Sequence, residues 1–97
     1  MILAFLLAVQ AAGYTPQEQR AVVASMECLK RNIDAVPRRA RRRQGEALID
    51  QAFRACAGEE AALRALLRSR FSEDSAERAV AIVRDASRDR MRRYIGR

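Results

Sequence analysis

Two cysteines, Cys28 and Cys56, are the residues of this chain whose type is best suited to covalent chemistry. They could form a disulfide, act as a redox-active pair or contribute to a metal site. A redox-active pair is typically a Cys-x-x-Cys motif, which the sequence lacks. Zinc requires four ligands, and two thiols in a chain without histidine cannot supply them without acidic residues. We therefore expect a disulfide, and the alternative is two buried, unconnected thiols.

The spacing of the cysteines agrees with an independent signal for a turn. In an antiparallel helical hairpin, residues equidistant from the turn lie at the same height, and the midpoint of Cys28 and Cys56 is residue 42. Pro37 and Gly45, which both interrupt helices, have their midpoint at residue 41. A Cys28–Cys56 disulfide across the hairpin would close a loop of about 29 residues and contribute roughly 3–4 kcal/mol to stability.

Arginine is the second residue type with chemical potential. The net charge is +7, and the 19 basic residues include a single lysine, Lys30. Five arginines crowd into residues 38–43, and a helix that folds back from the C-terminal end would bring a second group beside them in a basic pole. Guanidinium groups bind carboxylates and phosphates through paired hydrogen bonds. The predicted anionic-partner-binding residues are Arg38, Arg39, Arg41, Arg42, Arg43, Arg88, Arg92 and Arg93.

An anionic lipid, a polyanion or an acidic protein would suit such a pole. The alternative is that the arginines are ordinary solvated faces, since arginine also stabilises the C-terminal end of a helix, and Asp85 and Asp89 lie close enough to neutralise some of them. Nucleic acid is disfavoured because the chain has few aromatic side chains for stacking and no helix-turn-helix or zinc motif. The oligomeric state is not indicated.

The inventory of polar residues argues against an enzyme. The chain has no histidine, no glycine-rich phosphate loop and no nucleophile elbow. The carboxylate pairs Glu59–Glu60 and Glu73–Asp74 are adjacent in sequence, so on a helix they point in different directions. We therefore expect no catalytic residue, no metal and no cofactor.

The elements that must position these residues are predicted to be helices. Only four glycines and two prolines occur, and alanine, arginine, leucine and glutamate are abundant. Thr15–Glu18 forms a capping box, and apolar residues then follow at heptad spacing, which predicts a helix over 16–36. This stripe consists of Val22, Met26, Leu29, Ile33 and Val36.

Two further helices are expected over 45–70 and 73–95, the last one capped by Ser72. The arginine run 38–43 is interpreted as the solvated connection before the second helix. That helix is predicted to be continuous with a kink at Gly58, or else to be two shorter helices. Since Cys28 lies away from the apolar stripe of the first helix, both sides of that helix would be covered. We therefore predict an all-α fold, a disulfide-linked hairpin extended to a three-helix bundle.

The first residues, MILAFLLAVQAAG, are uncharged and strongly apolar. The run 2–9 has the length of a signal-peptide core and is too short to span a bilayer, and Val9 and Ala11 suit a cleavage site after residue 11. The sequence thus predicts a signal peptide over 1–11 and a single helical domain over 12–97, periplasmic or secreted and without a transmembrane span. Because no basic residue precedes the apolar core, the alternative is a buried N-terminal helix of a cytosolic protein.

The segments Cys28–Leu29 and Glu46–Leu63 (EALIDQAFRACAGEEAAL) resemble small exported two-cysteine helical proteins of alphaproteobacteria. The resemblance covers about half of the predicted mature chain, mostly its alanine-rich helices, and implies a periplasmic helical fold without an activity. A more remote similarity is to small periplasmic acid-stress chaperones, which are also helical with one disulfide. This chain departs from them in being basic, in its closer cysteines and in its few aromatic residues.

These observations lead to one functional hypothesis and two alternatives. The first is a non-enzymatic periplasmic or secreted binding module whose arginine-rich pole meets an anionic surface or partner. The second is a periplasmic chaperone-like stress protein. The third, which requires an uncleaved N-terminus and free thiols, is a cytosolic basic nucleic-acid-binding protein.

Overall fold

The computed structural model describes residues 13–96, so the predicted signal peptide lies outside the described residues. Five helices occur within them and no strand, which confirms the all-helical prediction. The helices are α2 (Pro16–Asp34), α3 (Arg38–Gln44), α4 (Glu46–Ala55), α5 (Ala57–Arg68) and α6 (Glu73–Ile95). None of these helices is long and apolar enough to cross a bilayer.

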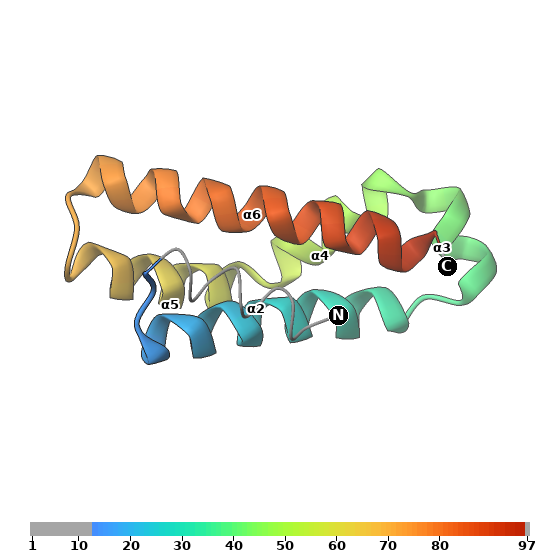
Figure 1. The fold of residues 1–97 in the computed structure, drawn as a ribbon. Coiled ribbons are helices and arrows are strands. Elements are labelled where there is room, and N and C mark those ends of the chain that lie inside the picture. The colour runs from blue at the N-terminus through green and yellow to red at the C-terminus, as the bar shows by residue number, and fades with distance from the viewer. Residues whose placement is uncertain (1–12, 97) are drawn as a thin grey trace.

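The helices form three parallel rows (Figure 1). Helix α2 runs along the first row, α4 and α5 return beside it in the second, and α6 runs back along both. The molecule is elongated, with extents of 42 × 24 × 17 Å. As a result, the C-terminal end of α6 lies at the same end of the molecule as α3, and the α5–α6 turn lies at the opposite end.

Helix α2 begins where the sequence predicts. The Thr15 side chain accepts a hydrogen bond from the Glu18 amide at 3.1 Å, and the Glu18 carboxylate accepts one from the Thr15 amide at 3.0 Å. The predicted end at residue 36 is two residues too far, because Ala35 caps the helix through its amide and Val36 already makes a turn to Ile33. Pro37, which cannot follow a helical residue easily, explains why the helix ends early.

The arginine run is a helix rather than the connection that we expected. Pro37 is the N-cap of α3, and the helix ends at Gly45, whose φ of +49° is in a region that favours glycine. Arginine has a high intrinsic helix propensity, which outweighs the repulsion between its like charges here. The expected solvation does hold, since α3 buries none of its residues.

The predicted helix over 45–70 is divided into α4 and α5, and the division is at Cys56 rather than at Gly58. Cys56 has φ −104° and ψ 21°, outside the helical region. Gly58 lies in the first turn of α5, where an added Cβ would meet no other atom within 4 Å. Nothing in the local sequence therefore requires a break at Cys56.

The core consists of two clusters along the long axis. One surrounds the cysteines, and the other lies toward the α5–α6 turn. Four residues of the predicted stripe of α2 belong to them, namely Val22, Met26, Leu29 and Ile33, and all four are buried. The first cluster contains Met26, Cys28, Leu29, Ile33, Leu48, Ile49, Ala52, Cys56 and Met91. The second contains Val22, Leu63, Leu67, Ala76, Val80 and Val83.

Candidate functional site

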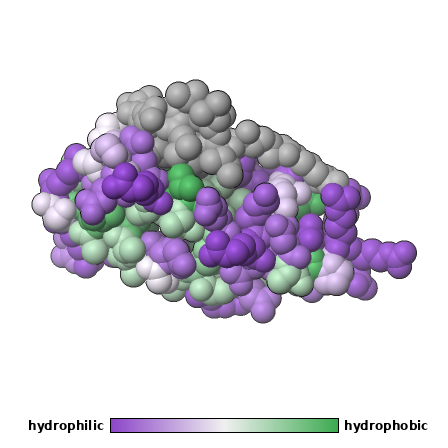
Figure 2. All heavy atoms as spheres, turned by 90° about the horizontal axis from the view of Figure 1, so that it is seen from below, coloured by the Kyte–Doolittle hydropathy of each residue, from purple (hydrophilic) through white to green (hydrophobic). Residues whose placement is uncertain are grey.

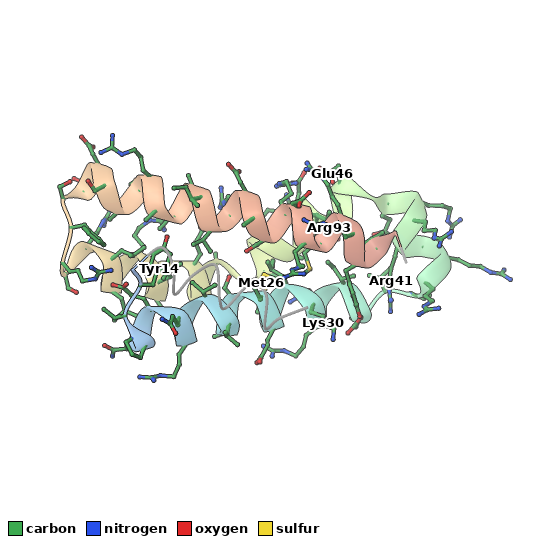
Figure 3. The ribbon with its side chains drawn as sticks, in the orientation of Figure 1. Tyr14, Met26, Lys30, Arg41, Glu46 and Arg93 are labelled. Atoms are coloured by element: carbon green, nitrogen blue, oxygen red, sulfur yellow. A yellow bond between two sulfur atoms is a disulfide. The ribbon has the colours of Figure 1, made fainter. Side chains whose placement is uncertain are left out.

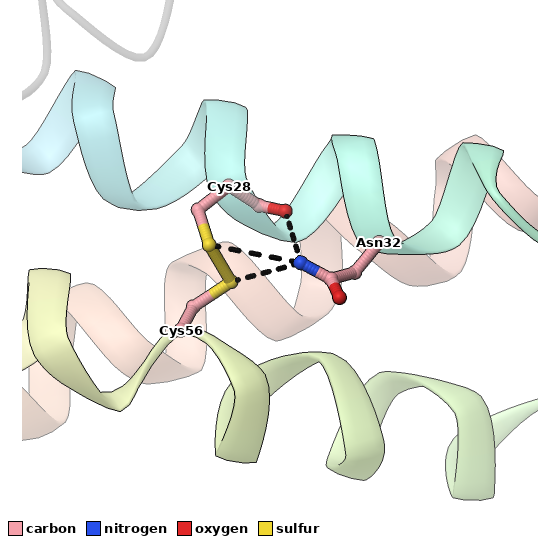
Figure 4. Close-up of a disulfide and its surroundings, with 3 residues drawn as sticks. All are labelled: Cys28, Asn32 and Cys56. Carbon is pink, nitrogen blue, oxygen red and sulfur yellow. Dashed lines mark hydrogen bonds between the residues drawn. A yellow bond between two sulfur atoms is a disulfide. The ribbon is translucent and has the colours of Figure 1, made fainter.

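The two cysteines join α2 to the junction of α4 and α5 (Figure 4). Their sulfur atoms lie 2.09 Å apart, at the distance of a disulfide bond, and their Cα atoms are 5.9 Å apart. Both residues are buried, with exposed fractions of 6% for Cys28 and 2% for Cys56. The geometry is that of the predicted disulfide, and it leaves no free cysteine among residues 13–96.

Asn32, one turn after Cys28 on α2, covers the disulfide from the side (Figure 4). Its side-chain amide donates a hydrogen bond to the carbonyl oxygen of Cys28 at 2.9 Å, and its nitrogen lies 3.4 Å from the sulfur of Cys56. The sequence analysis did not single out Asn32. The signal that could have found it is its position four residues after Cys28, which places both on one side of α2.

Among residues 13–96, one group has donor atoms close enough for a metal ion. The two sulfurs and a carboxylate oxygen of Glu59 lie within 4.8 Å of one another. As long as the sulfurs are bonded to each other, however, they cannot act as thiolate ligands. A metal at this place would therefore require reduction of the disulfide and further ligands.

Arg41 holds α3 against the end of α2. Its Nε donates to the Val36 carbonyl at 2.7 Å and its Nη2 to the Asp34 carbonyl at 3.2 Å, so one guanidinium satisfies two of the last carbonyl groups of that turn. The same nitrogen is 3.8 Å from the Asp34 carboxylate. Of the five arginines in residues 38–43, Arg41 is thus the one that attaches α3 to the end of α2, and in this way it positions the other four.

The remaining arginines of α3 are Arg38, Arg39, Arg42 and Arg43, and we call them the α3 cluster. All four are exposed, and none forms an ion pair with any residue in the range 13–96. In the side-chain view, long side chains project from α3 away from the other helices, while the labelled Arg41 lies toward α2 (Figure 3). The cluster therefore concentrates four positive charges on a helix of seven residues.

An open hollow of about 350 Å³ separates α3 from the end of α6. Arg38, Arg39, Arg41 and Arg42 line one side, and Tyr94 and Ile95 line the other. Tyr94 and Ile95 also pack against the core cluster around the cysteines. The hollow thus combines basic side chains on one side with partly buried side chains on the other that are packed against the core.

Tyr94 is itself held in place by its neighbours. Its hydroxyl donates a hydrogen bond to the Asp34 carboxylate, and the Lys30 ammonium group lies 5.4 Å from the centre of its ring. The bond to Asp34 is the main reason why the pKa of the Tyr94 hydroxyl is raised above its ordinary value. Sequence reasoning missed both Tyr94 and Asp34, because the two residues meet only when α6 folds back to the end of α2.

The predicted arginines of α6 are engaged within the molecule. Arg92 binds Glu46 through two nitrogens, at 2.6 and 3.0 Å, and Arg88 reaches Asp50 at 2.7 Å, so both join α6 to α4. Arg93 pairs with Asp89 on its own helix. The hydrogen bond from Arg92 holds the pKa of Glu46 below its usual range. The structure brings α6 to the end where α3 lies, but it directs these three guanidinium groups to carboxylates rather than toward a partner.

At the end of the molecule near the α5–α6 turn, opposite α3, acidic side chains are largely paired with arginines. Glu77 accepts from Arg64 at 2.7 Å, and Arg68 bridges Glu73 and Glu77 at 3.2 and 3.3 Å. The buried Glu18 carboxylate is bound by Arg70 through two nitrogens, at 2.8 and 2.7 Å. The hydrogen bond from Arg70 is the main cause that lowers the pKa of Glu18. An acidic pole opposite the α3 cluster is thus mostly neutralised.

The surface seen from below is predominantly hydrophilic, with scattered apolar side chains (Figure 2). Phe71 and Ile82 are the large hydrophobic residues exposed among those described, and they lie on the α5–α6 turn and in the middle of α6. They do not belong to one element or one hollow. The α3 cluster is therefore the most pronounced chemical feature of the described surface.

No family model matches this chain, and no curated protein and no solved structure matches it either.

Proposed function

We propose that this protein is a non-enzymatic, exported binding module whose α3 cluster engages an anionic partner. One observation carries the proposal: four arginines without an ion-pair partner in the range 13–96 share one exposed helix of seven residues. The other exposed arginines without an ion pair in this range are spread over three helices, and they are Arg20, Arg31, Arg54 and Arg78. Arg92, by contrast, is paired with Glu46 across helices. The contrast supports a role for the α3 cluster outside the fold itself.

The spacing of the arginines within the α3 cluster favours binding of an anionic partner. Arg38 and Arg42, and likewise Arg39 and Arg43, are four residues apart, where like charges destabilise an isolated helix by about 0.2–0.5 kcal/mol per pair. Binding of anionic groups would remove this repulsion and add charge-assisted hydrogen bonds. Since Arg41 ties α3 to the end of α2 and Gly45 caps its C-terminal end, the backbone that carries these charges is in place before the partner arrives.

Export is the second part of the proposal, and two features support it. The apolar segment of residues 1–11 has the composition of a signal peptide. Cys28 and Cys56 lie at disulfide distance, and disulfides persist in oxidising compartments such as the periplasm. A chaperone-like role receives less support, because clients would need a broad apolar surface, and Phe71 and Ile82, the large hydrophobic residues exposed within 13–96, lie on different elements.

The experiment that tests the proposal is retention on immobilised heparin in a salt gradient. The variant R38Q/R39Q/R42Q/R43Q removes the α3 cluster. The control R20Q/R31Q/R54Q/R78Q removes the same amount of charge from exposed arginines on α2, α4 and α6, none of which is in an ion pair within 13–96. Both variants have the same net charge, so a difference between them reports position rather than total charge.

We expect the wild-type protein and the control to be retained to similar salt concentrations, and the cluster variant to elute much earlier. Equal elution of the two variants would mean that only net charge matters, and the proposal would then be wrong. Circular dichroism of each variant checks that the fold is kept, which we expect since α3 buries none of its side chains.

A further inference from the structure

We infer that the anionic partner is a membrane surface rich in acidic phospholipid, with the α3 cluster lying against the headgroups and the hollow beside Tyr94 receiving one phosphate group. This inference rests on the proposed function and names the partner of the same site. It follows from three properties of the site: the number of charges, the lining of the hollow and the place of α3 in the molecule.

The number of charges argues for an array of anionic groups. A single phosphate is satisfied by one or two guanidinium groups. The α3 cluster has four of them spread over a helix about 10 Å long. A small soluble anion would leave at least two arginines without a partner, whereas a lipid surface presents many phosphates side by side.

The lining of the hollow favours lipid over a soluble polyanion. Arg38, Arg39 and Arg42 line one part of it, and Tyr94 and Ile95 line another. A phospholipid offers both kinds of group, because its charged phosphate is joined through glycerol esters to apolar acyl chains. Tyrosine is also a residue that suits the boundary between headgroups and hydrocarbon. A sulfated polysaccharide or a nucleic acid backbone offers no apolar part to Tyr94 and Ile95.

The position of α3 at one end of the molecule leaves it accessible to a flat membrane surface. Helix α3 lies at one end of a molecule that is 42 Å long, and it buries none of its residues (Figure 1). A flat surface can therefore meet the α3 cluster without displacing another element. Binding would be peripheral and reversible, with each arginine near the surface contributing about a fivefold increase in affinity.

Vesicle sedimentation tests the inference with the variants already described. The probes are vesicles of phosphatidylglycerol mixed with phosphatidylcholine, and vesicles of pure phosphatidylcholine. We expect the wild-type protein and the R20Q/R31Q/R54Q/R78Q control to bind the acidic vesicles and R38Q/R39Q/R42Q/R43Q to bind about 600-fold more weakly, at about fivefold for each of the four arginines. Added salt should weaken binding, and inorganic phosphate at equal ionic strength should have no additional effect.

Several results would overturn the inference. Equal loss in both variants, or equal binding to the neutral vesicles, would show that the α3 cluster does not recognise acidic lipid. Full competition by inorganic phosphate would assign the hollow to the free anion. Heparin retention that depends on the cluster, without vesicle binding, would assign it to a soluble polyanion and leave the proposed function standing. All proteins are used in the proposed mature form that begins at residue 12, so the apolar segment 1–11 does not contribute to vesicle binding.

Discussion

Cys56 is bonded to Cys28 and is also the residue at which α4 ends and α5 begins. The two facts have one explanation. The residues around it, Phe-Arg-Ala-Cys-Ala, are compatible with a continuous helix, and Gly58 has neither a positive φ nor a close contact that would demand a break. The break and the cross-link coincide at one residue, and we infer that the cross-link overrides the local helix preference.

Removal of the cross-link should join α4 and α5. We expect C28S/C56S to be about 3–4 kcal/mol less stable than the wild type, as the loop-entropy argument predicts. We also expect the amides of Ala57 and Gly58, which are among the first of α5 and lack intrahelical partners, to become protected in a continuous helix. Hydrogen exchange measures this protection, with the amides of α6 as the reference. Sulfate is added to stabilise the variant, so that it is folded during the measurement.

Gly58→Ala provides the control for this prediction. It keeps the disulfide, adds a methyl group in open space and should stabilise the protein by about 0.5–1 kcal/mol without closing the break. If the break persisted in C28S/C56S, or closed in the glycine variant, the cross-link would not be its cause.

The ion pair between Glu18 and Arg70 should make stability depend on acid. The Glu18 carboxylate is 2% exposed and its pKa is lowered, chiefly by the hydrogen bond from Arg70. A lowered pKa in the folded state means that the stabilisation is fully present above the unfolded-state value of about 4.3 and is lost as the pH falls through the folded-state value.

Glu18→Gln tests this dependence. At neutral pH it should cost about 1–3 kcal/mol, because the buried charge-assisted bonds to Arg70 are weakened. Urea unfolding from pH 7 to pH 3 should then show a smaller loss of stability in the variant than in the wild type. Glu73→Gln, whose side chain is 77% exposed, should change little. If the free energy of unfolding fell equally for Glu18→Gln and the wild type as the pH was lowered, the role of this pair would be refuted.

Ser87 is a polar residue inside the packed helices whose removal should be favourable. It is 1% exposed, and its hydroxyl has no hydrogen-bond partner in the structure as described. Ser87→Ala removes this unsatisfied group and improves helix propensity, so it should raise the free energy of unfolding by about 1 kcal/mol. Thermal unfolding measures the change, and a lower melting temperature would mean that the hydroxyl does have a partner.

The sequence predicts more of the elements than of their contacts. The capping box at Thr15 and the stripe of α2 follow from local spacing, and the cysteine pairing follows from symmetry about one turn. The division at Cys56 could not be predicted, because no local feature of the sequence marks it. Likewise, Arg88 and Arg92 were expected at a binding site, but Glu46 and Asp50 lie opposite them once α4 and α6 pack together.

Export and oxidation together predict a defined chemical form of the native protein. Intact mass spectrometry of material recovered from its own cells should show a chain that begins after Ala11. Reduction should increase the mass by two hydrogens, since the Cys28–Cys56 bond opens. Native protein that retains Met1, and in which both sulfurs react with an alkylating agent before reduction, would contradict the proposed export.

The most direct test of the role of the α3 cluster is a residue-resolved NMR titration of the isotopically labelled protein with phosphatidylglycerol nanodiscs. The account predicts that the first chemical-shift changes fall on residues 38–43 and on Tyr94 and Ile95, while the α5–α6 turn is unaffected. Changes centred on another face, or the same changes in R38Q/R39Q/R42Q/R43Q, would contradict it.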